Sequence, residues 1–493
     1  MAIFDVAVIG SGFGGSVAAL RAAQAGKRVV VLEQGRRLAP ADLEAGAKST
    51  RALLWEPALG LHGYFRQTLL RHLTIVGGVG VGGGSIVYAA VMLKPKDYAG
   101  RGWTAAGIDW ATELEPHFAE AARMLGRERN PQRGIQDQWL QAAAEHMGVG
   151  ETYGATYQGI SFADCIACGQ CITGCPHGAK NSTDLTYLAQ AEDLGAQILA
   201  LSKAHILVPV HDGWRVVVRN PLTQQVSSVE AKEVVVAAGV LGTVELLSAC
   251  RDRWKTLPEL SSMLGRRVRT NSEAFSAILH PPGTDVTHGA TISSDFYPNP
   301  DTHVTNNRFP KSYGFMRWYL SPLVSGDRRR ETLRAMLTQP EVASANARAK
   351  DWHKRITILT VMQRADNEMA LSYRKGPLGW ALRSEIPAGV DPVPVSLPEA
   401  DAAGRAVAEV SGGRAYATVL DSLLGMGATA HILGGAVLGP DPDSGVVDTD
   451  LQVHGYPGLR VMDGSVMPEN VGVNPSWTIT AMAERACARW LGG

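Results

Sequence analysis

The chain has no excess of charge of either sign, because 47 lysines and arginines balance 47 aspartates and glutamates over 493 residues. A balanced chain gives no electrostatic argument for binding nucleic acid or an anionic membrane surface. The first apolar run begins at Asp5, which leaves no room for a secretory or twin-arginine leader before it. We therefore expect a cytoplasmic protein.

The chain also lacks a long apolar stretch of the kind that crosses a membrane. Residues 73–93 carry no charge, but six glycines fall between Gly77 and Gly84 and would weaken an isolated helix. We predict a strand, a loop and a second strand there, and no transmembrane segment. Only six cysteines are present, and without an export signal disulfides are not expected. The length predicts two or more domains.

The first thirty residues read as a strand, a glycine turn, a helix and a second strand. An apolar run over residues 5–9 stops at the sequence GSGFGG of residues 10–15, and an alanine-rich helix over 16–25 follows. A second apolar run over 27–32 ends at Glu33. This order places the G-x-G-x-x-G pattern in the strand-turn-helix context that binds an adenine dinucleotide.

Each residue of this motif has a separate physical reason. Gly10 would make the tight turn, Gly12 would let the backbone approach a pyrophosphate, and Gly15 would let the helix lie close to the strand. Free N–H groups and a partial positive charge at the helix start favour phosphate. Glu33 would accept hydrogen bonds from a ribose hydroxyl.

A second informative stretch contains four of the six cysteines within eleven residues, followed by Pro176: Cys165, Cys168, Cys171 and Cys175. The spacing C-x2-C-x2-C-x3-C-P is that of bacterial ferredoxins and favours an iron-sulfur cluster. A zinc site usually separates two cysteine pairs by a longer spacer. Zinc and a loop without metal stay open as alternatives. The fourth cluster ligand is also open, because Cys175, Cys250 or Cys487 could supply it.

The end of the chain offers a further helix start. Residues 459–462 predict a strand that ends at Asp463 and Gly464. Asn474 and Pro475 predict the N-cap and first position of an amphipathic helix that runs to Leu491. The partial positive charge of such a helix start suits the anionic edge of a reduced flavin.

Six motifs in order along the chain resemble the glucose-methanol-choline (GMC) oxidoreductases, in particular the branch of cholesterol oxidase and its bacterial relatives. They are GSGFGG with Glu33, GVGGGSIVY, CGQCITGCPHGAKNS, VVVAAGVLGTVELL, TAHILGG and VMDGSVMPENVGVNPSWTITA. The resemblance implies noncovalent FAD. It implies an α/β fold, in which a Rossmann-type FAD-binding domain with a parallel sheet and a β-meander carries a mainly antiparallel substrate cap.

We assign the FAD-binding domain to residues 1–100, 181–270 and 425–493. The cap takes 101–180 and 271–424, and includes the cysteine-rich loop 164–180. The aromatic side chains of the cap indicate a hydrophobic substrate. The resemblance assigns these residues to the cofactor: Gly10, Gly12, Phe13, Gly14, Gly15, Glu33, Gly82, Gly83, Gly84, Ser85, Tyr88, Ala238, Gly239, Asp463, Gly464, Asn474 and Pro475.

The resemblance also implies a catalytic pair, His431 and Asn474. His431 would accept the proton of an alcohol hydroxyl while a hydride leaves for flavin N5, and Asn474 would orient the hydroxyl. The expected substrate is a hydrophobic alcohol, such as a sterol, another polycyclic or a long-chain alcohol. The cavity glutamate with which steroid oxidases isomerise a double bond has no clear match among Gln363, Asp366 and Glu368, so isomerase activity is not predicted.

Several functional alternatives stay open at this stage. Electrons could leave through a [4Fe-4S] cluster to an acceptor protein or a quinone, or could pass directly to oxygen. The same flavin could serve a C–C desaturase, an ene-reductase or an isomerase acting on an enone. A pure electron-transfer flavoprotein would not need the pair of His431 and Asn474.

Overall fold

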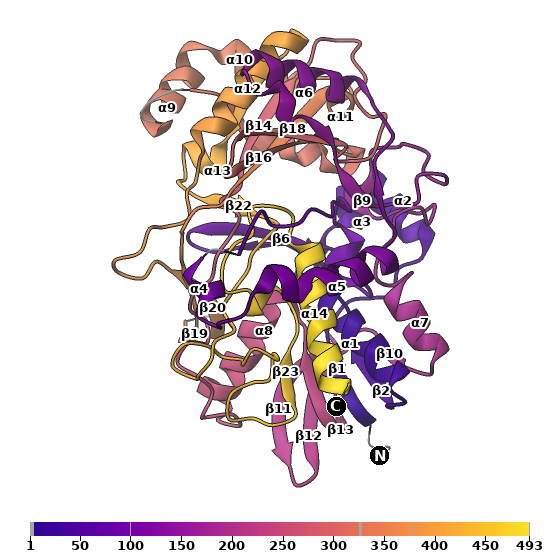
Figure 1. Ribbon diagram of the computed structural model, residues 1–493. Helices are drawn as coiled ribbons and strands as arrows, with labels where there is room; N and C mark the ends of the chain where they lie inside the picture. The colour runs from indigo at the N-terminus through magenta and orange to yellow at the C-terminus, as the bar shows by residue number, and fades with distance from the viewer. Residues whose placement is uncertain (1–3, 99, 325–327, 378, 493) are drawn as a thin grey trace.

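A computed structural model describes residues 4–98, 100–324, 328–377 and 379–492. Two seven-stranded sheets lie at opposite ends of the molecule, with helices packed against both (Figure 1). The predicted α/β class is confirmed. No helix among the described residues combines the length and apolar character that spanning a membrane requires.

The first sheet gathers strands from three parts of the chain. Its strand order is β10-β2-β1-β13-β12-β11, and β23 pairs with β13. β2, β1, β13, β10 and β23 pair in parallel, while β11, β12 and β13 form an antiparallel meander. The strands are β1 (Phe4–Ile9), β2 (Val29–Leu32), β10 (Gln197–Leu199), β11 (Lys203–Val210), β12 (Gly213–Arg219), β13 (Val226–Val236) and β23 (Leu459–Val461).

Helices bury the parallel strands of this sheet. β1 and β2 are rich in valine and almost wholly buried, as strands covered on both faces must be. α1 (Phe13–Gln24) packs against α14 (Ser476–Leu491) and α7 (Tyr187–Asp193), and α8 (Gly239–Ser248) follows β13. α5 (Trp110–Met124) also packs on α14.

The second sheet is antiparallel throughout, in the order β17-β21-β14-β18-β16-β15-β8. Alternate residues of β14 point to two different cores. Ala274 and Ile278 pack with α6 and α12, whereas Ala277 and Leu279 pack with Trp352. The elements are β8 (Gly154–Ala155), β14 (Ala274–Leu279), β15 (Ser294–Asn299), β16 (Thr302–Asn307), β17 (Leu320–Pro322), β18 (Ile356–Gln363), β21 (Arg414–Thr418), α6 (Ile135–His146) and α12 (Pro398–Ser411).

Short elements connect the two sheets. A three-stranded sheet pairs β22 with β6 and β6 with β5, and three two-stranded sheets, β3-β4, β7-β9 and β19-β20, stand apart from it. The remaining elements are α2 (Pro40–Lys48), α3 (Thr50–Leu53), β3 (Trp55–Glu56), β4 (Leu61–His62), β5 (Phe65–Leu69), β6 (Leu73–Gly78), α4 (Arg101–Thr104), β7 (Arg127–Arg129), β9 (Tyr157–Gly159), α9 (Arg328–Thr338), α10 (Pro340–Arg348), α11 (Trp352–Arg355), β19 (Ala370–Gly376), β20 (Gly379–Glu385), α13 (Val419–Ser422) and β22 (Gly427–Thr429).

Three local predictions need correction. After β6, the described residues up to 93 contain a short 3-10 turn, η2 (Gly83–Ile86), and no second regular strand, because Gly82 and Gly83 turn the chain with positive φ. α1 starts at Phe13, three residues before the predicted position. The N-cap of α14 is Pro475, and no side chain caps this helix, because the side chain of Asn474 contacts His431 instead.

The domain boundaries stay a prediction. α5 lies in the segment 101–180 assigned to the cap. Its residues Trp110, Leu114 and Phe118 are nevertheless buried in the core that α1 and α14 share with the first sheet. This packing favours counting α5 with the first sheet.

Candidate active site and cysteine pocket

Backbone crossings at the carboxyl ends of β1, β13 and β23 explain several glycines of the first motif. A Cβ at Gly10 would lie 2.2 Å from the carbonyl oxygen of Ala237, and a Cβ at Gly14 would lie 1.7 Å from that of Met462. Both positions therefore require glycine for packing alone.

Gly12 is different, because the protein leaves the space beside it open. A Cβ there would meet no protein atom closer than the Gly84 nitrogen at 4.0 Å. Gly12 is also the N-cap of α1, which has no side-chain cap and no acidic residue in its first turn. The free N–H groups and the open space fit the pyrophosphate of a dinucleotide such as FAD.

Glu33 already has partners within the protein. One carboxylate oxygen accepts hydrogen bonds from the Ser11 N–H (3.2 Å) and hydroxyl (2.7 Å), and the other accepts from the Gly35 N–H (2.8 Å). Burial raises the pKa of Glu33, and these hydrogen bonds oppose that rise. Its contact with a ribose hydroxyl stays a prediction.

The second glycine loop lies directly against the first. The Gly82 N–H donates to the Ser11 hydroxyl oxygen (3.1 Å), and a Cβ at Gly83 would lie 2.7 Å from Gly12 Cα. Ser85 donates to the Gly82 carbonyl (2.7 Å) and is fully buried. The predicted loop residues Gly82 to Ser85 are thus brought to the dinucleotide motif.

The fourth and sixth motifs meet through Asp463. One carboxylate oxygen accepts hydrogen bonds from the Gly239 N–H (2.9 Å) and the Thr243 hydroxyl (2.5 Å), and the other accepts from the Ser465 N–H (2.8 Å). Burial raises the pKa of Asp463. Ala238, the N-cap of α8, adjoins this crossing. How each of these residues contacts a cofactor stays a prediction.

His431 stands between an amide and a carboxylate. It lies on the loop after β22, with Nε2 3.2 Å from Asn474 Nδ2 and Nδ1 2.5 Å from Glu273 Oε1. The side chain of His431 is 16% exposed, and that of Glu273 is 1% exposed. The predicted pair of His431 and Asn474 is therefore in contact, and a buried carboxylate stands on the opposite ring nitrogen.

Glu273 was missed by the sequence reasoning. Its Oε1 also accepts the Ala430 N–H (3.3 Å), while its Oε2 has no partner. The two atoms Glu273 Oε1 and His431 Nδ1 lie 2.5 Å apart without the geometry of a hydrogen bond, and His431 Nδ1 has no hydrogen-bond partner among the described residues. The one available signal was an acidic residue placed immediately before the buried strand β14.

The three acidic or amide residues weighed from the sequence lie elsewhere. Gln363 donates to the Thr302 hydroxyl (3.0 Å). Asp366 has a side chain that is 93% exposed and pairs with Arg269 (2.7 Å), and Glu368 lies 3.9 Å from the same arginine.

The segment before β14 also positions the Asn474 loop. Asn271 donates from its side-chain amide to the Val473 carbonyl (2.7 Å) and accepts from the Gly472 N–H (3.2 Å). Ser272 between Asn271 and Glu273 has φ 51°, which is uncommon for a residue other than glycine. One short segment therefore contacts both loops that carry the catalytic pair.

The aromatic residues of the second sheet region do not outline a substrate site. Phe296 and Tyr313 are buried in apolar cores, and Trp318 is 67% exposed. These three side chains therefore pack in cores or lie at the surface, and the hydrophobic substrate stays a prediction.

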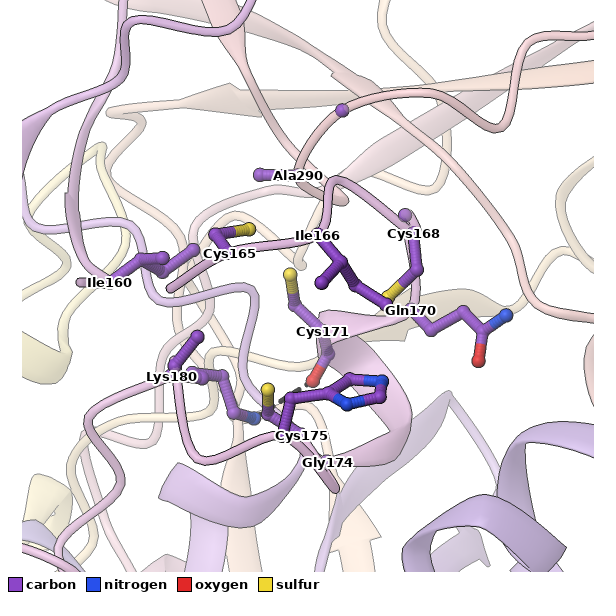
Figure 2. A pocket seen from close by; sticks show the side chains of 14 residues that line it. Ile160, Cys165, Ile166, Cys168, Gln170, Cys171, Gly174, Cys175, Lys180 and Ala290 are labelled. Carbon is purple, nitrogen blue, oxygen red and sulfur yellow. Dashed lines mark hydrogen bonds between the residues drawn. The ribbon is translucent and has the colours of Figure 1, made fainter. Parts of the chain in front are cut away.

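The four clustered cysteines line a small pocket of their own. Figure 2 shows the side chains of Cys165, Cys168, Cys171 and Cys175 around it, together with Lys180. Burial raises the pKa of the Cys168 thiol to about 11 and also raises that of Cys171. Within the described parts of the chain, no three His, Cys, Asp or Glu side chains are grouped closely enough to hold a single metal ion.

Cys250 and Cys487 do not reach this pocket. Both are buried in the core of the first sheet, where Cys250 Sγ accepts the Leu207 N–H (3.2 Å) and Cys487 contacts the sulfur of Met462 (3.8 Å). Neither residue lines the cysteine pocket, so a remote fourth ligand is not supported by the packing.

Family models described as GMC oxidoreductase match residues 8–250 and 342–483. A cholesterol oxidase of Mycobacterium tuberculosis is 36% identical over 99% of this chain and 91% of its own length. The chain belongs to the GMC oxidoreductase family. It is accordingly an FAD-dependent oxidoreductase acting on CH–OH donors, as predicted.

Other relatives agree with this assignment. A cholesterol oxidase of Acinetobacter baumannii is 34% identical over 98% of this chain and 93% of its own, and a long-chain-alcohol oxidase of Arabidopsis thaliana is 26% identical over 97% and 66%. The crystal structure of a pyridoxine 4-oxidase from Mesorbium loti has the same fold, with a TM-score of 0.67, 17% identity and 99% of each chain covered.

Proposed function

We propose that this GMC oxidoreductase oxidises a hydrophobic alcohol, of the sterol or long-chain class, to a carbonyl compound. The observation that carries the proposal is the contact of His431 with Asn474 on one ring nitrogen and with buried Glu273 on the other. The names of the relatives, cholesterol oxidases and long-chain-alcohol oxidases, support the substrate class.

The carboxylate of Glu273 sets the role of each nitrogen of His431. A proton on Nδ1 faces the negative charge, so Nε2 carries the lone pair. This lone pair accepts a hydrogen bond from the Asn474 amide (3.2 Å) until the hydroxyl of a bound alcohol replaces the amide and gives up its proton. The imidazolium that forms is stabilised by the buried carboxylate 2.5 Å away. FAD, when bound, accepts the hydride from the carbinol carbon.

Asn474 would orient the substrate hydroxyl. Its Nδ2 lies beside His431 Nε2, where the hydroxyl must sit to lose its proton, and its Oδ1 has no partner among the described residues. A buried carbonyl oxygen without a partner is costly, so a substrate hydroxyl that donates to it would bind favourably. An amide also cannot compete for the proton.

We further propose that the electrons leave through an iron-sulfur cluster to an external acceptor, a redox protein or a quinone. The cysteine spacing and the position of the pocket beside the dinucleotide loop support this path. The names of the relatives favour direct use of oxygen instead. Turnover with an artificial one-electron acceptor under nitrogen, compared with oxygen consumption in air, decides between the two paths.

The substrate class is tested by anaerobic mixing with 3β-hydroxysteroids and with long-chain alcohols. The flavin absorbance should bleach, and a ketone or an aldehyde should appear in equal amount. If neither class of alcohol bleaches the flavin, the substrate class is wrong. Bleaching without a carbonyl product would instead indicate desaturation.

A further inference from the structure

We propose that Cys165, Cys168, Cys171 and Cys175 hold one [4Fe-4S] cluster complete within this chain, and that buried Lys180 is its counter-charge. The direction of electron flow through such a cluster rests on the proposed alcohol oxidation. The ligand set and the role of Lys180 do not rest on it.

The cysteine loop is folded tightly around the pocket that its sulfurs line. Ala167, Gly169 and Gly174, which stand between the cysteines, all have positive φ, of 56°, 70° and 83°. A bridge between Ile160 and Lys180 closes the base of the loop. The loop is therefore a defined structure, and its sharp turns bring the four cysteines to the lining of one pocket (Figure 2).

A segment of the cap fastens the other side of the loop. The Gly289 N–H donates to the Ala167 carbonyl (2.9 Å), and the Thr291 hydroxyl donates to the Gly169 carbonyl (3.0 Å). The Thr291 N–H lies 3.5 Å from Cys171 Sγ. Hydrogen bonds of this kind to ligand sulfurs are among the features that set the potential of an iron-sulfur cluster.

The pocket suits a cluster better than a single ion. With a Zn–S bond of about 2.3 Å, a tetrahedral zinc site draws its four sulfurs to within about 4 Å of one another. Among the described residues, no three possible ligands are grouped so that they could hold a metal ion. A cubane places four metal atoms and four sulfides between the cysteines, so its ligands stand farther apart and surround a cavity.

Lys180 supplies an independent observation that the occupant is anionic. It is 2% exposed, and its Nζ donates to the carbonyl oxygens of Ile86 (2.6 Å), Cys171 (2.8 Å) and Tyr88 (3.2 Å). No carboxylate of the described residues forms an ion pair with Lys180, and the Asp184 carboxylate acts on its charge only from farther away. Burying a charge without a partner is costly, and a cluster bound by four thiolates is negatively charged as a whole.

The pocket also lies next to the dinucleotide loop. The Tyr88 ring is in edge contact with Phe13 of that loop, with 5.2 Å between ring centroids, and Lys180 Nζ lies 5.1 Å from the centre of the same ring. Tyr88 packs against the apolar cluster that contacts Cys165 and Cys171. One aromatic side chain therefore separates the cysteine pocket from the predicted cofactor site.

The first test counts iron and acid-labile sulfide in the full-length protein purified without oxygen. We expect about four of each per chain and, after reduction with dithionite, an electron paramagnetic resonance signal of a reduced cluster. Absence of iron even after reconstitution with ferrous iron and sulfide, or one zinc ion per chain, would overturn the proposal.

Variants then test the ligand set. Cys171→Ser should lose most of the iron, whereas Cys250→Ser, which changes a buried cysteine of the first sheet, should keep all of it. Equal iron in both variants would contradict the assignment. A variant that folds poorly would also lose iron. The iron content of the unaltered protein, measured first, therefore decides whether a cluster is present, and the variants test only which cysteines are its ligands.

Lys180→Met tests the counter-charge. The variant should keep its iron, but its cluster potential should shift to more negative values, because the added electron loses a neighbouring positive charge. Lys203→Met, at a partly exposed lysine paired with Glu245, is the matched control and should leave the potential unchanged. An unchanged potential in Lys180→Met would refute this role. Anaerobic bleaching by an alcohol does not require the cluster, so failure of either proposal is recognised separately.

Discussion

The two seven-stranded sheets contribute to the same site in different ways. The first sheet contributes backbone groups to the site. Its parallel strands β1, β13 and β23 all end at one edge, where glycines and free N–H groups meet. The second sheet presents side chains, because Asn271 and Glu273, just before β14, contact the loops of Asn474 and His431. The first sheet thus carries the proposed binding surface for FAD, and the segment before β14 of the second sheet contacts the proposed proton acceptor, His431.

The largest effect on the rate of flavin reduction is expected from a substitution at His431. His431→Ala removes the proton acceptor, and general-base catalysis is worth about 10² to 10⁴ in rate. Flavin reduction by an alcohol should slow by that factor under anaerobic conditions, while the FAD content stays the same. An unchanged rate would show that another group accepts the proton.

Acidic pH should lower the free energy of unfolding through His280, which lies beside the second sheet. This residue lies at the end of β14, bonds to Thr357 (2.8 Å) and Ser411 (3.1 Å), and has a pKa lowered by burial to about 4. The neutral ring therefore stabilises the fold above pH 6.5, and this contribution is lost as the pH falls from 6.5 through 4. The loss amounts to about 3 kcal/mol, taking 1.36 kcal/mol for each pKa unit.

Denaturant unfolding at pH 7 and pH 4.5 measures this loss. His280→Gln keeps a hydrogen-bonding side chain that does not titrate, so it should lose less stability over the same range. If the variant and the unaltered protein lose the same amount, the acid sensitivity arises from other groups.

Glu273→Gln tests the contribution of the second sheet to catalysis. The substitution keeps the shape but removes the charge beside His431 Nδ1. A hydrogen bond or contact with a charged partner is worth about 1.5–3 kcal/mol, which corresponds to roughly a 10- to 150-fold loss in kcat. KM and FAD content should hold, because Glu273 lies on the side of the ring away from Asn474. Glu385→Gln, at a partly exposed glutamate of β20, is the control and should have normal kcat.

The smallest expected effects are those of substitutions at Gly12 and Gly14, which follow β1 and have different roles. Gly14→Ala should destabilise the fold by about 1–3 kcal/mol even without FAD, because its Cβ would meet the Met462 carbonyl oxygen. Gly12→Ala should cost less than about 1 kcal/mol in the apoprotein and weaken FAD binding instead. Thermal unfolding with and without FAD measures both. Equal destabilisation of the two apoproteins would contradict a cofactor role for Gly12.

The sequence was sufficient where function depends on local spacing. The glycine motif is encoded within one short stretch, and the parallel strands follow from valine-rich runs bounded by glycine. His431 and Asn474 lie 43 positions apart, and only the family resemblance paired them in advance. Glu273 could not be found this way, because its contact with His431 joins residues 158 positions apart in the chain. The N-cap prediction for Asn474 failed because local propensity yielded to a tertiary contact with His431.

The most direct test of the central claim is rapid anaerobic mixing of the holoenzyme with an alcohol deuterated at the carbinol carbon, beside its undeuterated form. If the alcohol C–H bond is broken as a hydride and His431 takes the hydroxyl proton, the deuterated alcohol should reduce the flavin more slowly, and the product should be the carbonyl compound. Flavin that stays oxidised with both forms, or reduction without a carbonyl product, would contradict the account.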